Sequence, residues 1–295
     1  MISFYESSAR ERINHLVDPN TFVEILPPSS KEQSPHLKLL NIVSSFDDGI
    51  IIGKARLNNH SILIASQEGK FMGGTVGEVH GAKLVGLLQS AISCEVKAVY
   101  LLIDSGGVRL HEANAGLIAI SEIMRAIFTL RNHNIPVYAI IGSQNGCFGG
   151  MGIVAACCNA VCMNEEGRWG VSGPEVIETV CGVEEFDSQD KPLVWRTLGG
   201  KHRYIMKAID IIVPDDVNEF KKAAYTLLNK KEEVRISLES IKKAQNKFKE
   251  DLKEYKEVKD AIDIWRLKNI NKLESISLLN NSDFLNAVKG ESNGN

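Results

Sequence analysis

Continuously apolar runs alternate with longer helical stretches in the middle of this chain. KAVYLLIDS (97–105) and IPVYAIIGS (135–143) are apolar at nearly every position, which is typical of strands buried on both faces. GEVHGAKLVGLLQSAIS (77–93) precedes the first run, and a 24-residue stretch of helical pattern (111–134) separates the two. Because parallel strands need crossovers of helix length, this pattern predicts an α/β sheet.

An earlier group of apolar runs has much shorter connections. LNIVSSF (40–46), GIIIGKARL (49–57) and HSILIASQ (60–67) are joined through Asp47-Asp48 and Asn58-Asn59. Turns of two residues are typical of hairpins. We therefore expect three antiparallel strands here, leading into the parallel part of the sheet.

The charge of the chain divides it into two parts. Residues 221–272 carry a net charge of +6, whereas residues 1–220 carry −7. The basic part contains neither Pro nor Gly and has the pattern of a helix. We predict a domain over 1–225 and a helical, basic C-terminal extension over 226–295. The positive charge is typical of a solvated helical face, and it also fits a surface that docks an acidic partner.

The composition indicates a globular protein. Hydrophobic residues make up 44% and charged residues 24% of the chain, and its net charge is −3. An overall negative charge argues against nucleic-acid binding, and no apolar run reaches the roughly eighteen residues of a membrane span. The first twenty residues lack the apolar segment of a signal peptide, so we expect a cytoplasmic protein.

The six cysteines do not have the spacing of a metal site. They include Cys157, Cys158 and Cys162, which lie in the apolar run IVAACCNAVC, and there is no C-x-x-C pair. Small buried thiols fit this context better than thiolate ligands. We expect no metal site and no disulfide.

Four glycine-bearing turns carry the candidate chemistry. Paired glycines at the start of a helix let backbone N–H groups approach a ligand, and two such groups can hold an oxyanion. Tight turns in any compact sheet also use glycine, but four in one core favour a functional site. The turns are Phe71-Met72-Gly73-Gly74, Asp104-Ser105-Gly106-Gly107, Cys147-Phe148-Gly149-Gly150 and Val171-Ser172-Gly173-Pro174.

Two familiar motifs do not explain these turns. Residues 150–155 match G-x-G-x-x-A, but the preceding strand ends well before Gly150, and no acidic strand end follows at the required distance. Neither Ser105 nor Ser172 lies in G-x-S-x-G. Ser105 with His111 as its base is an alternative nucleophile, although a serine in this position more often caps a helix.

Several segments resemble the carboxyltransferase subunits of acyl-thioester carboxylases, and most closely the β subunits of malonate decarboxylases. The chain lacks the zinc ribbon typical of acetyl-CoA carboxylase β subunits, and it contains one half of the fold where propionyl-CoA-type enzymes contain two. The resemblance covers about residues 10–225. The segments are SARERINHLVDPNTFVEI (8–25), GKARLNNHSILIASQEGKFMGGTVGEVHGAKL (53–84), LLIDSGGVRLHEA (101–113) and GGMGIVAACCNAVCMNEEGRWGVSGPEVIE (149–178).

The resemblance implies a crotonase-like ββα superhelix and a lyase that decarboxylates a malonyl thioester through an enolate. It implies two partners, a γ subunit of related fold and an acyl carrier protein subunit that holds the substrate. The thioester then belongs to the prosthetic group of that carrier, and this chain binds no cofactor of its own. Transfer of the carboxyl group to biotin and a non-catalytic scaffold role are the alternatives.

The resemblance also implies roles for the glycine turns. Gly106 and Gly107 would donate N–H groups to the enolate oxygen. Ser105 and Arg109 belong to the substrate-binding set, although Arg109 and Glu112 also fit a pair that braces the turn. His80 and His111 are candidates for returning a proton to the enolate, and each also fits an ordinary helix-face residue. The glycines implied to line the pantetheine arm are Gly73, Gly74, Gly149 and Gly150.

Overall fold

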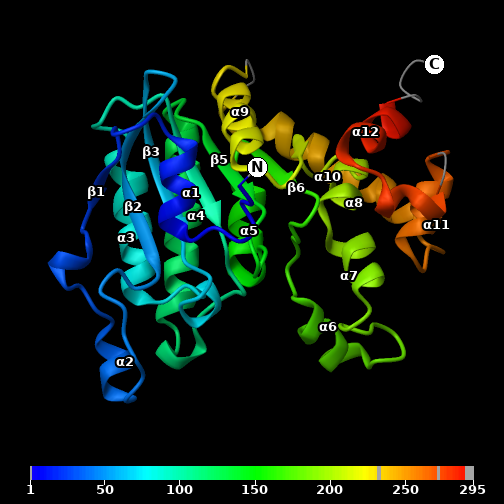
Figure 1. Ribbon diagram of the computed structural model, residues 1–295. Coiled ribbons are helices and arrows are strands. Elements are labelled where there is room, and N and C mark those ends of the chain that lie inside the picture. The colour runs from blue at the N-terminus through cyan, green and yellow to red at the C-terminus, as the bar shows by residue number, and fades with distance from the viewer. Residues whose placement is uncertain (1, 231–233, 271–272, 290–295) are drawn as a thin grey trace.

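The computed structural model describes residues 2–230, 234–270 and 273–289 (Figure 1). Within these residues, seven strands form one sheet whose spatial order follows the sequence. The first three strands pair antiparallel, and the third to the seventh pair parallel. The strands are β1 (Val23–Ile25), β2 (Ile50–Leu57), β3 (His60–Gln67), β4 (Ala98–Ile103), β5 (Val137–Ile141), β6 (Ala160–Asn164) and β7 (Ile211–Val213).

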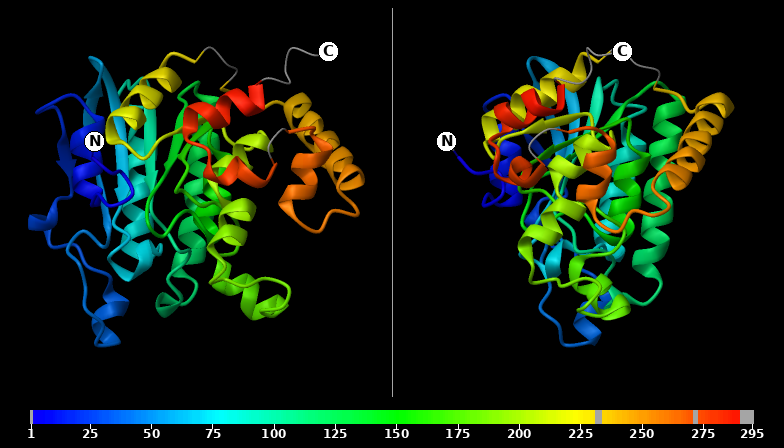
Figure 2. Two further views of the ribbon diagram at one scale, coloured as in Figure 1. Left: turned by 45° about the vertical axis from the view of Figure 1, so that its right-hand side comes forward. Right: turned by 90° about the vertical axis from the view of Figure 1, so that its right-hand side faces the viewer.

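Helices cover both faces of the sheet (Figures 1 and 2). α1 (Ala9–Leu16) and α9 (Val217–Leu228) pack on one face. α3 (Glu78–Ser90), α4 (Ala115–Asn132) and α5 (Gly149–Cys157) pack on the other. The remaining helices are α2 (Pro35–Leu39), α6 (Pro174–Cys181), α7 (Lys191–Leu198), α8 (Gly200–Ile205), α10 (Leu238–Glu254), α11 (Ala261–Leu267) and α12 (Asn281–Lys289).

The strand β4 shows why a continuously apolar run suits this architecture. Leu101 and Ile103 belong to the core beneath α3 and α4, whereas Tyr100 and Leu102 belong to the core beneath α1 and α9. Successive side chains point to opposite faces, so both sets of residues must be apolar. The predicted parallel α/β sheet is confirmed.

One of the two predicted hairpins is present. β2 and β3 pair from Leu57 opposite His60, with Asn58 and Asn59 forming the turn. Both asparagines have positive φ, at 48° and 65°. This is the backbone that a two-residue turn of the favoured hand requires, and asparagine tolerates it better than most residues do.

The prediction of a strand over residues 40–46 is wrong. Leu40 ends α2, and the next residue, Asn41, has a φ of 55° that stops an extended strand. The place beside β2 is instead taken by β1. The Asp47 carboxylate accepts the N–H of Gly49 and the hydroxyl of Ser45, so Asp47-Asp48 forms a local turn rather than a hairpin.

The basic C-terminal part is divided into separate helices rather than one continuous helix: the described residues of 221–272 contain the end of α9, then α10 and α11. α10 ends at Glu254, and α11 begins after Asp260, whose carboxylate caps it. The indole of Trp265 in α11 is buried and donates to Nδ1 of His202, 3.1 Å away. Trp265 and Phe284 belong to the same core cluster as α3 and α4. No helix in the described part of the chain is long and apolar enough to cross a bilayer.

We expect Trp265→Ala to lower the free energy of unfolding by about 3–5 kcal/mol, because it empties a large buried volume. The matched control is Leu267→Ala in the same helix, where the side chain is 53% exposed. That control should change stability by less than about 0.5 kcal/mol. Chemical denaturation of both variants measures the difference, and equal losses would contradict the anchoring role of Trp265.

Candidate active site

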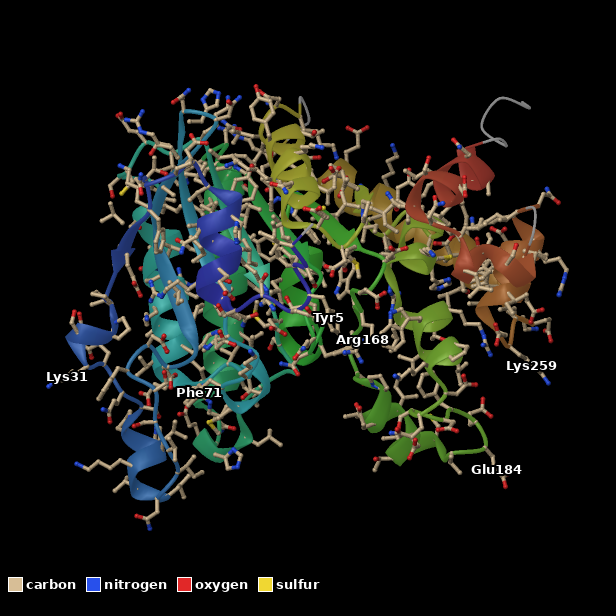
Figure 3. All side chains as sticks on the ribbon, in the orientation of Figure 1. Tyr5, Lys31, Phe71, Arg168, Glu184 and Lys259 are labelled. Carbon is tan, nitrogen blue, oxygen red and sulfur yellow. The ribbon has the colours of Figure 1, made fainter. Side chains whose placement is uncertain are left out.

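The loops that follow the carboxyl ends of the parallel strands are joined by short β-bridges. Ser105 bridges Cys147, and Cys147 in turn bridges Trp169. The carboxyl ends of parallel strands lie at one edge of a sheet, where ligands usually bind. Phe71 and Arg168 mark this region in the lower half of Figure 3. The structure thus brings all four glycine turns together.

The first two turns meet through their backbones. The N–H of Gly106 donates to the carbonyl of Gly73 at 2.8 Å. Gly74 has a φ of 66°, and a Cβ placed on it would lie 1.7 Å from the carbonyl oxygen of Asp104. No side chain fits at that distance, so this approach requires glycine at position 74.

The second and third turns are equally close. Gly107 has a φ of 137° and Gly149 a φ of 58°, and a Cβ on Gly149 would lie 2.7 Å from the Cα of Gly107. The segment 105–107 therefore lies directly against the start of α5. The two glycine pairs form one continuous backbone wall.

The N–H groups of this wall differ in what they bind. The N–H of Gly107 lies 3.2 Å from the hydroxyl of Ser105, and that of Gly149 donates to Val171 at 2.8 Å. Within the described part of the chain, the N–H groups of Gly150 and Met151 have no acceptor, and no side chain caps α5. Free N–H groups at a helix start, with the positive end of its dipole, are suited to bind an anion.

Ser105 is engaged within its own turn. Its side chain is fully buried, and its hydroxyl accepts the N–H of Gly107 and lies 3.3 Å from the carbonyl of that residue. His111 is exposed in the 3₁₀ turn Leu110–Glu112, and it forms no hydrogen bond with Ser105. The arrangement does not support a Ser105–His111 nucleophile. Ser105 stabilises its own turn, and Asn114 is the cap of α4.

Arg109 follows the second glycine turn in the sequence and lies in the core. Its side chain is fully buried and donates to both carboxylate oxygens of Asp48 at 2.9 Å and to Glu112 at 3.2 Å. Burial raises the pKa of Asp48, although the positive charge of Arg109 acts to lower that pKa. Burial also acts to raise the pKa of Glu112, but the hydrogen bonds from Ser34 and from the N–H of Glu78 lower it overall. These contacts are consistent with a structural role in which Arg109, Asp48 and Glu112 stabilise the second glycine turn.

A third buried ion pair, which the sequence pattern did not predict, supports the end of β4. Arg12 in α1 donates to the carboxylate of Asp104 at 2.9 Å, and both side chains are almost completely buried. The other carboxylate oxygen of Asp104 accepts the N–H of Asn145. The pair thus ties α1, β4 and the loop after β5 together. The sequence feature that could have pointed to this pair is the position of Asp104 directly after an apolar strand.

His80 is buried in α3, with both ring nitrogens engaged. Nε2 lies 3.0 Å from the amide nitrogen of Gln67, and Nδ1 lies 3.1 Å from the carbonyl of Asp48. Burial, with the nearby charge of Arg109, lowers the pKa of His80 to about 3. The ring is therefore neutral at physiological pH, and it holds the Asp48 loop against α3.

This low pKa predicts how stability depends on pH. Below about pH 6.5 the unfolded chain protonates His80 and the folded chain does not, so stability falls by about 1.4 kcal/mol per pH unit down to about pH 3. We expect His80→Gln to reduce this slope by about one proton, as measured by denaturation at several pH values. The exposed control His111→Gln should keep the wild-type slope. Equal slopes in all three proteins would contradict the prediction.

The comparisons with known proteins agree with this architecture. The chain matches the carboxyl transferase domain over residues 6–237. It is 38% identical to the malonyl-S-ACP:biotin-protein carboxyltransferase of Malonomonas rubra, over 97% of this chain and 96% of that protein. It also resembles a chain of a Pseudomonas malonate decarboxylase hetero-tetramer solved with malonate, with a TM-score of 0.75 and 40% identity over 77% of this chain and 84% of that one.

A more distant solved structure has the same fold. Transcarboxylase 12S aligns with a TM-score of 0.64 and 26% identity, covering 75% of this chain and 41% of that one. The mixed sheet, the bridged loops and the glycine wall define an enzyme of the crotonase-like α/β class. The chain belongs to the carboxyl transferase domain family.

Proposed function

We propose that this chain is the β subunit of a malonate decarboxylase. It would act on a malonyl thioester held by an acyl carrier protein and release CO2, leaving an acetyl thioester. The observation that carries the proposal is the glycine wall, with two free N–H groups at the start of α5. The likeness to the Pseudomonas malonate decarboxylase chain supports it.

Decarboxylation requires little covalent chemistry from the protein. Loss of CO2 leaves an enolate whose negative charge lies on the thioester oxygen, so the enzyme must stabilise that oxygen and exclude water. In this proposal the N–H groups of Gly150 and Met151 hold the oxygen, because the N–H of Gly106 is already bonded to Gly73. One such donor is typically worth about 3 kcal/mol of transition-state stabilisation.

The other predicted residues shape the site. Gly106 and Gly107 would form the wall opposite α5, and Gly73 and Gly74 would leave room for the extended arm of the carrier's prosthetic group. Arg109 would hold the second turn in place through its buried contacts with Asp48 and with the carbonyl of Thr75, which follows Gly74. The two histidines near the turns do not fit as the proton donor to the enolate, because His80 is engaged and His111 faces solvent. We assign that donor to the partner subunit.

A partner subunit of related fold also fits the surface around the site. Apolar side chains are exposed beside it in the 3₁₀ turn Leu110–Glu112, at the start of α4, and in α6 and the residues next to it. Exposed large apolar side chains that gather near a site are typical of a subunit interface. The chain resembles subunits of Pseudomonas hetero-oligomers. These exposed residues are Leu110, Leu117, Ile118, Val171, Val176, Val180 and Val183.

The second candidate is transfer of the carboxyl group to biotin on another subunit. The likeness to the Malonomonas rubra protein along nearly the whole chain favours it specifically. The test is to assemble the complex with a malonyl-loaded carrier, measure CO2 release, and identify the acyl group left on the carrier by mass spectrometry. Release that continues with avidin present supports the decarboxylase. Release or carboxyl transfer that avidin blocks supports the biotin-dependent reaction.

A further inference from the structure

α10 makes no extensive contact with any other element of the described chain. None of its residues, from Leu238 to Glu254, is buried. Figure 2 shows it at the periphery of the molecule. A helix of this length is marginally stable on its own in water, because helices in proteins depend mainly on packing of an apolar face.

α10 nevertheless has an apolar face. Its large apolar side chains recur at the spacing that places them on one side of a helix, and each of them is more than half exposed. A stripe of this kind on a charged helix normally lies against another protein surface. Its residues are Leu238, Ile241, Phe248 and Leu252.

Lysines line one edge of this apolar stripe. At about 3.6 residues per turn, Lys242, Lys249 and Lys253 fall along a single edge. None of the three forms an ion pair with another described residue. Lys243 and Lys247 fall on the opposite side of the helix, among Glu239, Glu250 and Glu254.

We propose that α10 is the docking helix for the acidic acyl carrier protein. This inference rests on the proposed function for the identity of the partner. The apolar stripe would lie against the carrier, and the lysine edge would pair with its acidic side chains. Charge complementarity of this kind steers the encounter and fixes its orientation.

Two double variants of this chain, each assembled with the γ subunit and supplied with the carrier separately, test this proposal. The first, Lys242→Glu with Lys249→Glu, reverses the charges beside the stripe. The second, Lys243→Glu with Lys247→Glu, makes the same change in net charge on the opposite side. The probe is an acyl carrier protein loaded with a malonyl group. Its KM, kcat and direct binding affinity are measured at about 50 and 200 mM salt, between which screening changes strongly.

We expect the first variant to raise KM and Kd at least about tenfold at low salt with little change in kcat, since the docking lysines do not touch the reacting atoms. The control should stay within about twofold of wild type. Equal effects of the two variants would overturn the proposal. So would loss of complex assembly in the first variant alone, or its selective loss of binding to vesicles containing anionic phospholipid, which would assign α10 to another partner.

The same experiment separates this inference from the proposed function. A wild-type complex that releases CO2 while both variants bind the carrier normally would overturn only the docking surface. A wild-type complex that releases no CO2 but binds the carrier through the same lysines would overturn only the proposed reaction.

Discussion

Gly149→Ala is expected to reduce the kcat of the assembled complex by at least about a hundredfold, because misplacing a catalytic group by about 1 Å has an effect of this size. The new Cβ would lie 2.7 Å from the Cα of Gly107, at a φ of 58° that alanine rarely adopts. Either α5 or the 105–107 segment must move. The free N–H groups of Gly150 and Met151 would move with α5.

The control for this prediction is Gly86→Ala. Gly86 is exposed in α3, and a Cβ placed there meets no atom within 4 Å. This control should retain full activity and gain about 0.5–1 kcal/mol of stability, since alanine favours a helix interior. Thermal unfolding and circular dichroism show whether each variant is folded. Full activity in folded Gly149→Ala and Gly107→Val complexes would instead support the scaffold alternative.

The chain by itself should not turn over a malonyl thioester. It supplies one glycine wall, and the exposed apolar residues around that wall fit a partner that completes the site. Residues 221–272 contain no glycine, so the C-terminal helices offer no second pair of glycine turns. We expect the lone chain to be folded, to self-associate through its exposed apolar surface, and to lack activity.

The measurement is CO2 release from malonyl-loaded carrier protein by the purified chain, before and after the partner subunit is added. Addition should restore activity in proportion to the amount of complex formed. Turnover by the lone chain at a rate similar to that of the complex would show that the chain is self-sufficient. In that case two copies of this chain would supply both halves of the site.

The apolar patterning was sufficient to predict β2 to β5, but it did not predict β1, β6 or β7. β4 and β5 have apolar residues at every position because they are buried on both faces, and this local pattern is readable without any tertiary information. The hairpin at Asn58-Asn59 was equally predictable from its turn residues. The strand predicted over 40–46 was wrong, because its apolar residues satisfy local strand preference while β1 occupies the neighbouring position in the sheet.

The glycine turns could also be predicted from the sequence alone, since paired glycines that follow apolar runs are visible there. Which N–H groups of those turns are free depends on how distant segments pack together. The N–H of Gly106 donates to the carbonyl of Gly73, a residue 33 positions away, whereas the N–H groups of Gly150 and Met151 at the start of α5 have no acceptor among the described residues. The buried pairs Arg12–Asp104 and Arg109–Asp48 likewise join residues 92 and 61 positions apart. A hydrogen bond or ion pair depends on distance and direction in space, and these arise only when distant segments pack together.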